Sequence, residues 1–274
     1  MIRIFSDSTC DLSKELVERY DITILPLHIL LGEEEFLDGV NITPDEIYKW
    51  SDEHKTTPKT SAVSIEDVMK AAKPYLDQGD EIISFSISDD MSTSGNVMHM
   101  AAAELEAEDR FHVINSANLS TGIGLLVIEA AIMAKAGKTS EEIITKIEEL
   151  KPLVRASFVV DTLTYLYRGG RCSGLAALAG GALKLHPQII VVDGAMKPAK
   201  KYRGNMLHVT LDYVRDMEKA MLNSHKDRVF ITHSGSDPKV VQEVYDYLEG
   251  LHYFDEICIT RAGGVVSSHC GYGT

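Results

Sequence analysis

Hydroxyl side chains gather at four places in the sequence. Residues 6–9, 88–94 and 116–121 each follow a segment expected to be a strand, and residues 60–61 precede an expected helix. Ligands of α/β proteins bind at the carboxyl ends of strands, where such side chains can converge. Each segment alone also fits an ordinary helix cap, because Ser, Thr and Asp bind nearby backbone groups. The four together favour a polar pocket that accepts an anion.

Two glycine-flanked segments add an arginine and a histidine. Arg171 follows Gly169 and Gly170, where the backbone can turn sharply and approach another group closely. The same pattern also fits a helix C-cap with surface arginines. His269 lies in the Gly/Ser-rich residues 263–273, which we expect to form a loop. Structural and functional roles for this histidine both stay open.

Familiar catalytic and cofactor motifs do not explain the chain. Residues 122–127 begin like a dinucleotide-binding loop but lack its third glycine, and no phosphate-binding, zinc-protease or nucleophile-elbow motif is present. Residues 236–239 match S-x-x-K but fit a helix start with proline in its first turn. The cysteines form no C-x-x-C pair, so we expect neither disulfides nor a metal site. They are Cys10, Cys172, Cys258 and Cys270.

The elements that must position these side chains alternate between strands and helices. The predicted strands of the first half are apolar on both faces, as in a parallel sheet covered by helices. They span residues 2–5, 22–31, 81–86 and 111–115. Helices are predicted to begin at capping residues 43 and 64 and near 140, and to span 93–106 and 121–136. The first half is therefore predicted to be an α/β layer fold.

A proline marks the expected seam between two domains. Pro152 disfavours helix in the residue before it. Beyond it, strands are predicted at 157–160, 188–192, 228–232 and 256–260, and helices at 206–223 and 238–250. We therefore predict an α/β fold of two α/β domains in close contact, residues 1–152 with a Rossmann-like parallel sheet and residues 153–274 with an α/β layer.

Composition excludes several kinds of partner. The chain has 274 residues, with 41 Asp and Glu against 27 Lys and Arg, a net charge of −14. Such a molecule repels nucleic acid and anionic membrane surfaces. The longest uncharged apolar run with helical character, residues 175–183, is shorter than the ~18–20 residues needed to span a bilayer. No signal-peptide core precedes Asp7, so we expect a cytoplasmic protein without a membrane span.

Several short segments, taken in order, resemble the motifs of one known family. Residues 7–12 (DSTCDL) resemble D-S-T-A-D-L, and residues 59–64 (KTSAVS) are similar to K-T-S-Q-P-S. Residues 86–94 look like S-I-S-x-x-L-S-G-T, and residues 169–173 look like G-G-R-I-S. Residues 202–204 resemble an R-G segment, and residues 268–274 resemble T-H-x-G-P-G-T. The matches run across essentially the whole chain, and together they resemble the motifs of the DegV family of fatty-acid-binding proteins.

The resemblance implies a long-chain fatty acid of the palmitate class, bound between the two domains. It assigns the carboxylate to Thr60 and Ser92, with Ser61 beside them, and places Arg171 and His269 at the same head group. It implies a carrier without cofactor or catalytic residues. In the family, a separate ATP-dependent fatty acid kinase phosphorylates the presented carboxylate.

The physical chemistry agrees with that implication. A carboxylate that leaves water needs hydroxyls, N–H groups or a positive charge, and Arg171 or a protonated His269 could supply the charge. A palmitate-class tail has about fourteen methylenes, so at roughly 0.8 kcal/mol each its burial contributes about 11 kcal/mol before ordering costs. The leucines of an apolar run are expected to line the tail, although each also fits an ordinary core. They are Leu175, Leu178 and Leu183.

The sequence departs from the family pattern near the head group. Thr93 replaces the glycine after the key serine, Tyr272 replaces a proline, and residues 62–63 replace Q-P. Asp89 and Asp90 place negative charge near a carboxylate site, which is unfavourable unless both point away.

Two alternatives of other classes stay open. One is a hydrolase or transferase in which His269 acts as general base on a hydroxyl such as that of Ser92. The other is a regulatory protein that senses acyl chains through a partner.

Overall fold

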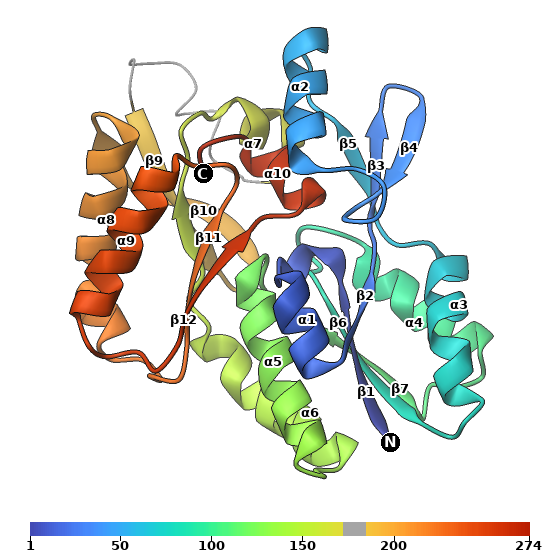
Figure 1. Ribbon diagram of the computed structural model, residues 1–274. Helices are drawn as coiled ribbons and strands as arrows, with labels where there is room; N and C mark the ends of the chain where they lie inside the picture. The colour runs from blue at the N-terminus through green and yellow to red at the C-terminus, as the bar shows by residue number, and fades with distance from the viewer. Residues whose placement is uncertain (172–184) are drawn as a thin grey trace.

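The structure, a computed structural model, describes residues 1–171 and 185–274. Its central element is a parallel sheet of four strands in the order β2-β1-β6-β7 (Figure 1). The strands are β1 (Ile2–Asp7), β2 (Ile22–Leu25), β6 (Glu81–Ser86) and β7 (Phe111–Asn115). The predicted α/β fold with a parallel first sheet is confirmed.

Helices cover both faces of this sheet, which explains why its strands have apolar residues on both faces. Ile4 and Ile83 pack with α5 (Thr121–Lys135) and α6 (Ser140–Leu150). Phe5 and Ile82 face the other way, toward α3 (Ile65–Leu76) and α4 (Ser94–Glu104). The short α1 (Lys14–Tyr20) lies beside α5, as Figure 1 shows.

A small antiparallel sheet in the order β4-β3-β5 stands beside the parallel one. It consists of β3 (His28–Leu31), β4 (Glu34–Leu37) and β5 (Lys59–Ser61), and α2 (Pro44–His54) lies between β4 and β5 in the chain. The prediction of one strand over residues 22–31 is therefore wrong. The chain breaks at Pro26, which has no N–H to donate to a ladder, and its second part pairs elsewhere.

The second half of the chain forms two further sheets. An antiparallel sheet contains β8 (Ser157–Val159), β9 (Leu185–Val192) and β10 (Ala195–Arg203), and a parallel pair contains β11 (Val229–His233) and β12 (Ile257–Arg261). Two amphipathic helices, α8 (Met206–Met221) and α9 (Pro238–Gly250), share an apolar core with these strands. Strand β10 and helix α7 (Thr164–Gly169) were not predicted.

The helix starts read from capping residues are confirmed. Thr43 forms a full capping box with Glu46, and Ser64 accepts from the backbone N–H of Asp67. Asp237 caps α9, with Pro238 at its first position. These starts were visible because a capping interaction depends only on neighbours in sequence.

The loop predicted over residues 263–273 is wrong for most of its length. Residues Gly264–Cys270 form helix α10, which contacts α7, α2, β3, β5 and the 3-10 turn η1 (Ser8–Cys10). Figure 1 shows α10 next to α7 and α2, although the three are far apart in sequence. A second 3-10 turn, η2 (Lys151–Leu153), lies at the predicted domain seam. Across residues 1–171 and 185–274, no helix has the length and apolar character that crossing a membrane requires.

Candidate functional site

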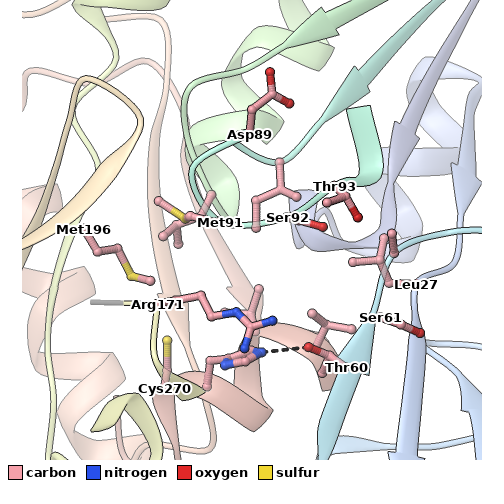
Figure 2. Close-up of a pocket in the computed structure, with 16 residues that line it drawn as sticks. Leu27, Thr60, Ser61, Asp89, Met91, Ser92, Thr93, Arg171, Met196 and Cys270 are labelled. Atoms are coloured by element: carbon pink, nitrogen blue, oxygen red, sulfur yellow. Dashed lines mark hydrogen bonds between the residues drawn. The ribbon is translucent and has the colours of Figure 1, made fainter. Parts of the chain in front are cut away.

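A cavity of about 510 Å³ lies where the two halves of the chain meet. Figure 2 shows polar side chains from β5 and the loop after β6 facing Arg171 across it. The cavity contains all five residues predicted for the head group and is otherwise mainly apolar. It is lined by Leu27, Thr60, Ser61, Ala62, Ile87, Asp89, Met91, Ser92, Thr93, Leu119, Arg171, Met196, Val265, Val266, His269 and Cys270.

The hydroxyl of Thr60 and the imidazole of His269 form a hydrogen bond inside this cavity. Thr60 Oγ1 lies 2.8 Å from His269 Nε2 (Figure 2). The other ring nitrogen, Nδ1, is buried and has no hydrogen-bond partner within residues 1–171 and 185–274. A Cβ added to Gly169 would stand 2.4 Å from that nitrogen, so the ring rests directly on the backbone of α7.

His269 is a neutral group in this environment. Burial, with a smaller contribution from the positive charge of Arg171, lowers the pKa of His269 from 6.5 to about 4. At neutral pH its imidazole donates or accepts hydrogen bonds without a charge. The positive charge of the site therefore comes from Arg171, and the expectation that His269 supplies it is not supported.

Arg171 follows a helix C-cap and also lines the cavity. Gly170 ends α7 in the left-handed conformation, with φ of 66°, so the two glycines do form a helix C-cap. Arg171 directly after it is exposed and also lines the cavity. Its Nη1 donates to the carbonyl oxygen of Gly169 at 2.6 Å, which holds the side chain close to its own turn.

Ser92 is bound to the start of α4. Its Oγ accepts from the backbone N–H of Ser94 at 3.2 Å and lies 2.9 Å from Ser94 Oγ. This hydroxyl thus accepts the first N–H of α4 and also lines the cavity. Ser61 and Thr93 line the cavity as well, and Thr93 stands at the N-cap position of α4.

The carboxylate of Asp89 is directed to the helix rather than to the head-group side chains. A Cβ on Gly95 would lie 2.7 Å from Asp89 Oδ1, so this oxygen sits against the first turn of α4. Figure 2 shows the carboxylate turned away from Thr60 and Ser92. Helix N-termini favour negative charge, which accounts for an acidic residue so close to the predicted carboxylate site.

Two of the four hydroxyl-rich segments do not contribute their hydroxyls to the cavity, contrary to the prediction. Ser8 Oγ donates to Asp38 and Ser120 Oγ donates to Asp11, while Thr9 Oγ1 donates to Asp7. These hydroxyls bind buried carboxylates, each of which also accepts a hydrogen bond from a backbone N–H. Hydroxyl residues that bind buried carboxylates and hydroxyl residues that line a cavity have the same local pattern in the sequence.

The apolar lining predicted from the sequence falls in a segment that the structure does not describe. Leu175, Leu178 and Leu183 lie outside the described residues. Much of the observed lining comes from α10, through Val265, Val266 and Cys270, and from residues that sequence reasoning did not single out. Nearly every residue of α10 is buried, so its sequence has no amphipathic pattern that could have identified these positions.

The general-base arrangement with Ser92 is not favoured by this geometry. His269 pairs with Thr60, and its lowered pKa makes it a weak base at neutral pH. No group of three or more His, Cys, Asp or Glu in the described part of the chain could hold a metal ion.

Comparisons with known proteins place the chain among proteins of one family. The DegV family model, described as an uncharacterised protein family, matches residues 1–274. A DegV domain-containing protein of Clostridium perfringens is 37% identical over 203 residues, which cover 74% of this chain and 72% of that protein.

Solved structures of two similar proteins superpose closely on this chain. A structure described as fatty-acid binding of a DegV family protein from Thermus thermophilus has a TM-score of 0.88 and 28% identity, covering 99% of this chain and 96% of that one. A stearic-acid-binding protein from Eubacterium ventriosum has a TM-score of 0.85 and 30% identity, covering 99% and 95%.

Proposed function

The chain belongs to the DegV family, and on that premise we propose that it binds a long-chain fatty acid of the palmitate class in the cavity between its two halves. The observation that carries the proposal is the Thr60–His269 hydrogen bond at the polar side of a mainly apolar cavity. Relatives described as binding stearic acid and other fatty acids support the ligand class.

In this proposal the carboxylate meets Thr60, Ser61, Ser92 and Arg171, with His269 behind Thr60. Because His269 is neutral, it orients the Thr60 hydroxyl rather than neutralising the ligand. Arg171 supplies the opposing charge. The tail lies against apolar side chains, and at roughly 0.8 kcal/mol per methylene its burial supplies most of the affinity.

We further propose that the protein is a carrier, and that a separate ATP-dependent kinase phosphorylates the bound carboxylate. Support comes from the position of Arg171, which is exposed while it lines the polar side of the cavity. A kinase could therefore reach the carboxylate without removing the tail from its apolar surroundings.

The test is native mass spectrometry of the purified protein, followed by release and identification of any bound small molecule. We expect one long-chain fatty acid per chain. A protein that carries none and takes up no added palmitate would refute the proposal.

Site variants locate the carboxylate. Thr60→Val keeps the shape of the side chain and removes its hydroxyl, so palmitate affinity should fall about tenfold, the effect of losing one hydrogen bond to a charged group. Thr145→Val is the matched control, since Thr145 lies exposed on α6. Equal affinities of the two variants in a titration would remove Thr60 from the carboxylate site.

A further inference from the structure

We propose that Asp11 and Asp38 are positioning residues for the head-group side of the cavity. They bind the first residues of α10 and thereby fix His269 against Thr60. This inference rests on the proposed function, because its readout is selectivity for a carboxylate.

Both carboxylates belong to the N-terminal part of the chain, and they bind the start of α10, which lies near the C-terminus. Asp11 Oδ1 accepts from the backbone N–H of Gly263 at 2.8 Å, and Asp38 Oδ1 accepts from that of Gly264 at 2.6 Å. The second oxygen of each is also bound, at 2.5 Å by Ser120 Oγ and at 2.8 Å by Ser8 Oγ. Every carboxylate oxygen therefore has a donor, and the helix start is bound at two successive residues.

The chemistry suits this position. The first N–H groups of a helix have no partner within the helix and carry partial positive charge, so carboxylates stabilise them. Burial raises the pKa of Asp11 to about 8 and also raises that of Asp38, while the hydrogen bonds from Ser120 and Ser8 oppose this shift. In either protonation state an oxygen remains to accept the backbone N–H.

The start of α10 has little room to move. A Cβ on Gly264 would lie 2.7 Å from Ile29 Cδ1 and 2.8 Å from Ile47 Cδ1. A Cβ on Gly263 would lie 3.2 Å from Asp38 Oδ2 and 3.3 Å from Asp11 Oδ1. Because the two glycines have no side chain, the backbone lies close to both carboxylates and to the side chains of Ile29 and Ile47.

Helix α10 is short, so the position of its start also determines the position of its residues that line the cavity. Val265 and Val266 line the cavity directly after the bound glycines, and His269 lies one turn further along. The imidazole has no slack, because Thr60 holds Nε2 and the Gly169 backbone lies against Nδ1. A displacement at Gly264 therefore changes the geometry at Thr60 Oγ1.

The test compares palmitate with the primary alcohol of the same chain length, so that tail binding and head-group binding are separated. In Asp38→Ala we expect the preference for acid over alcohol to fall about tenfold while alcohol affinity changes less than about twofold. Asp38→Asn keeps an oxygen that accepts the Gly264 N–H and should restore most of the preference. The same comparison of Asp11→Ala and Asp11→Asn should give the same pattern.

The control is Asp80→Ala. Asp80 is also buried, but it binds Arg3 and the N-terminus, away from α10. This variant should lose stability and keep the acid preference. Gly264→Ala, which displaces the start of α10 without changing a charge, provides a second route if Asp38→Ala does not fold.

The ¹⁵N resonances of the His269 ring give a second readout. They should shift in Asp38→Ala and Gly264→Ala and stay in place in Asp80→Ala. The positioning role would be overturned if Asp38→Ala and Gly264→Ala both kept the wild-type preference for acid over alcohol. It would also be overturned if Asp80→Ala lost that preference to the same extent. A wild-type protein that binds neither palmitate nor the alcohol would instead refute the proposed function.

Discussion

At the scale of single residues, the geometry of the proposed head-group site depends on a missing side chain. Gly169 is the last residue of α7, and the His269 ring occupies the space that any Cβ there would need. The Thr60–His269 hydrogen bond thus requires a glycine at position 169 because of the space that the ring needs, and not because of backbone conformation.

Gly169→Ala should therefore weaken palmitate binding about tenfold by pushing His269 away from Thr60. Gly250→Ala is a closely matched control, since Gly250 is also the last residue of its helix and no described atom lies within 4 Å of the added Cβ. It should keep affinity and raise the free energy of unfolding by roughly 0.5–1 kcal/mol. A titration calorimeter and urea unfolding measure the two effects. Normal affinity in Gly169→Ala would show that the ring has another place to go.

The lowered pKa of His269 predicts a pH dependence of stability. Between pH 6.5 and about 4 the unfolded chain binds a proton at His269 and the folded chain does not. The free energy of unfolding therefore has its full His269 contribution above pH 6.5 and loses it as pH falls. His269→Gln lacks this loss, so wild type should fall by about 3 kcal/mol relative to the variant from pH 7 to pH 4. Asp7 and Asp11 titrate in both proteins, and parallel stability curves would contradict the prediction.

At the scale of elements, helices that build the scaffold can be separated from those that build the site. α6 begins with a capping box between Thr139 and Glu142 and packs against α5, on the outer layer of the parallel sheet. α10 is shorter and lines the cavity. Substitutions at the start of α6 should therefore change stability, whereas substitutions at the start of α10 should change ligand binding.

Thr139→Ala should lower the free energy of unfolding by about 1 kcal/mol because the N-terminal cap of α6 is lost. Palmitate affinity should stay at the wild-type value. Thr139→Ser retains a capping oxygen and should be close to wild type in urea unfolding. A change in affinity in the alanine variant would mean that α6 is coupled to the cavity.

At the scale of the whole molecule, the two halves share their cores. Val160 and Ile189 belong to the same apolar cluster as Ile83 and Ile123, and Cys258 packs with Ile128. We propose the domain boundary between residues 152 and 153, but these shared clusters indicate that the halves fold together. A line of hydroxyls adds to the junction, from Thr121 to Thr232 at 2.7 Å and on to Thr260 at 3.0 Å.

Thr232→Val removes the middle hydroxyl and leaves those of Thr121 and Thr260 with fewer partners. The free energy of unfolding in urea should fall by about 1–3 kcal/mol, while Thr232→Ser should retain the wild-type value.

The wild-type protein should unfold in urea in one transition, seen by both Trp50 fluorescence and far-UV circular dichroism, since the shared cores couple the two halves. Separate transitions would show instead that the halves unfold independently.

The sequence by itself determined the fold class and the family. Buried parallel strands read as continuous apolar runs, and helix starts such as Thr43 and Ser64 depend on residues three positions away, so both were visible locally. The DegV motifs, in order along the chain, indicated five residues for a proposed head-group site, and the fold places all five around one cavity.

Only the tertiary structure decided how that cavity is built. A seven-residue segment that begins at Gly264 is too short to be stable as an isolated helix, and its local composition resembles a loop. Asp11 and Asp38, more than two hundred residues away, bind the N–H groups of Gly263 and Gly264 at its start, and Ile29 and Ile47 lie against it. Strand β5 likewise exists only through its pairing with β3. Contacts between distant residues leave no periodic pattern in the chain, so the hydrogen bond between Thr60 and His269 became visible only in the folded molecule.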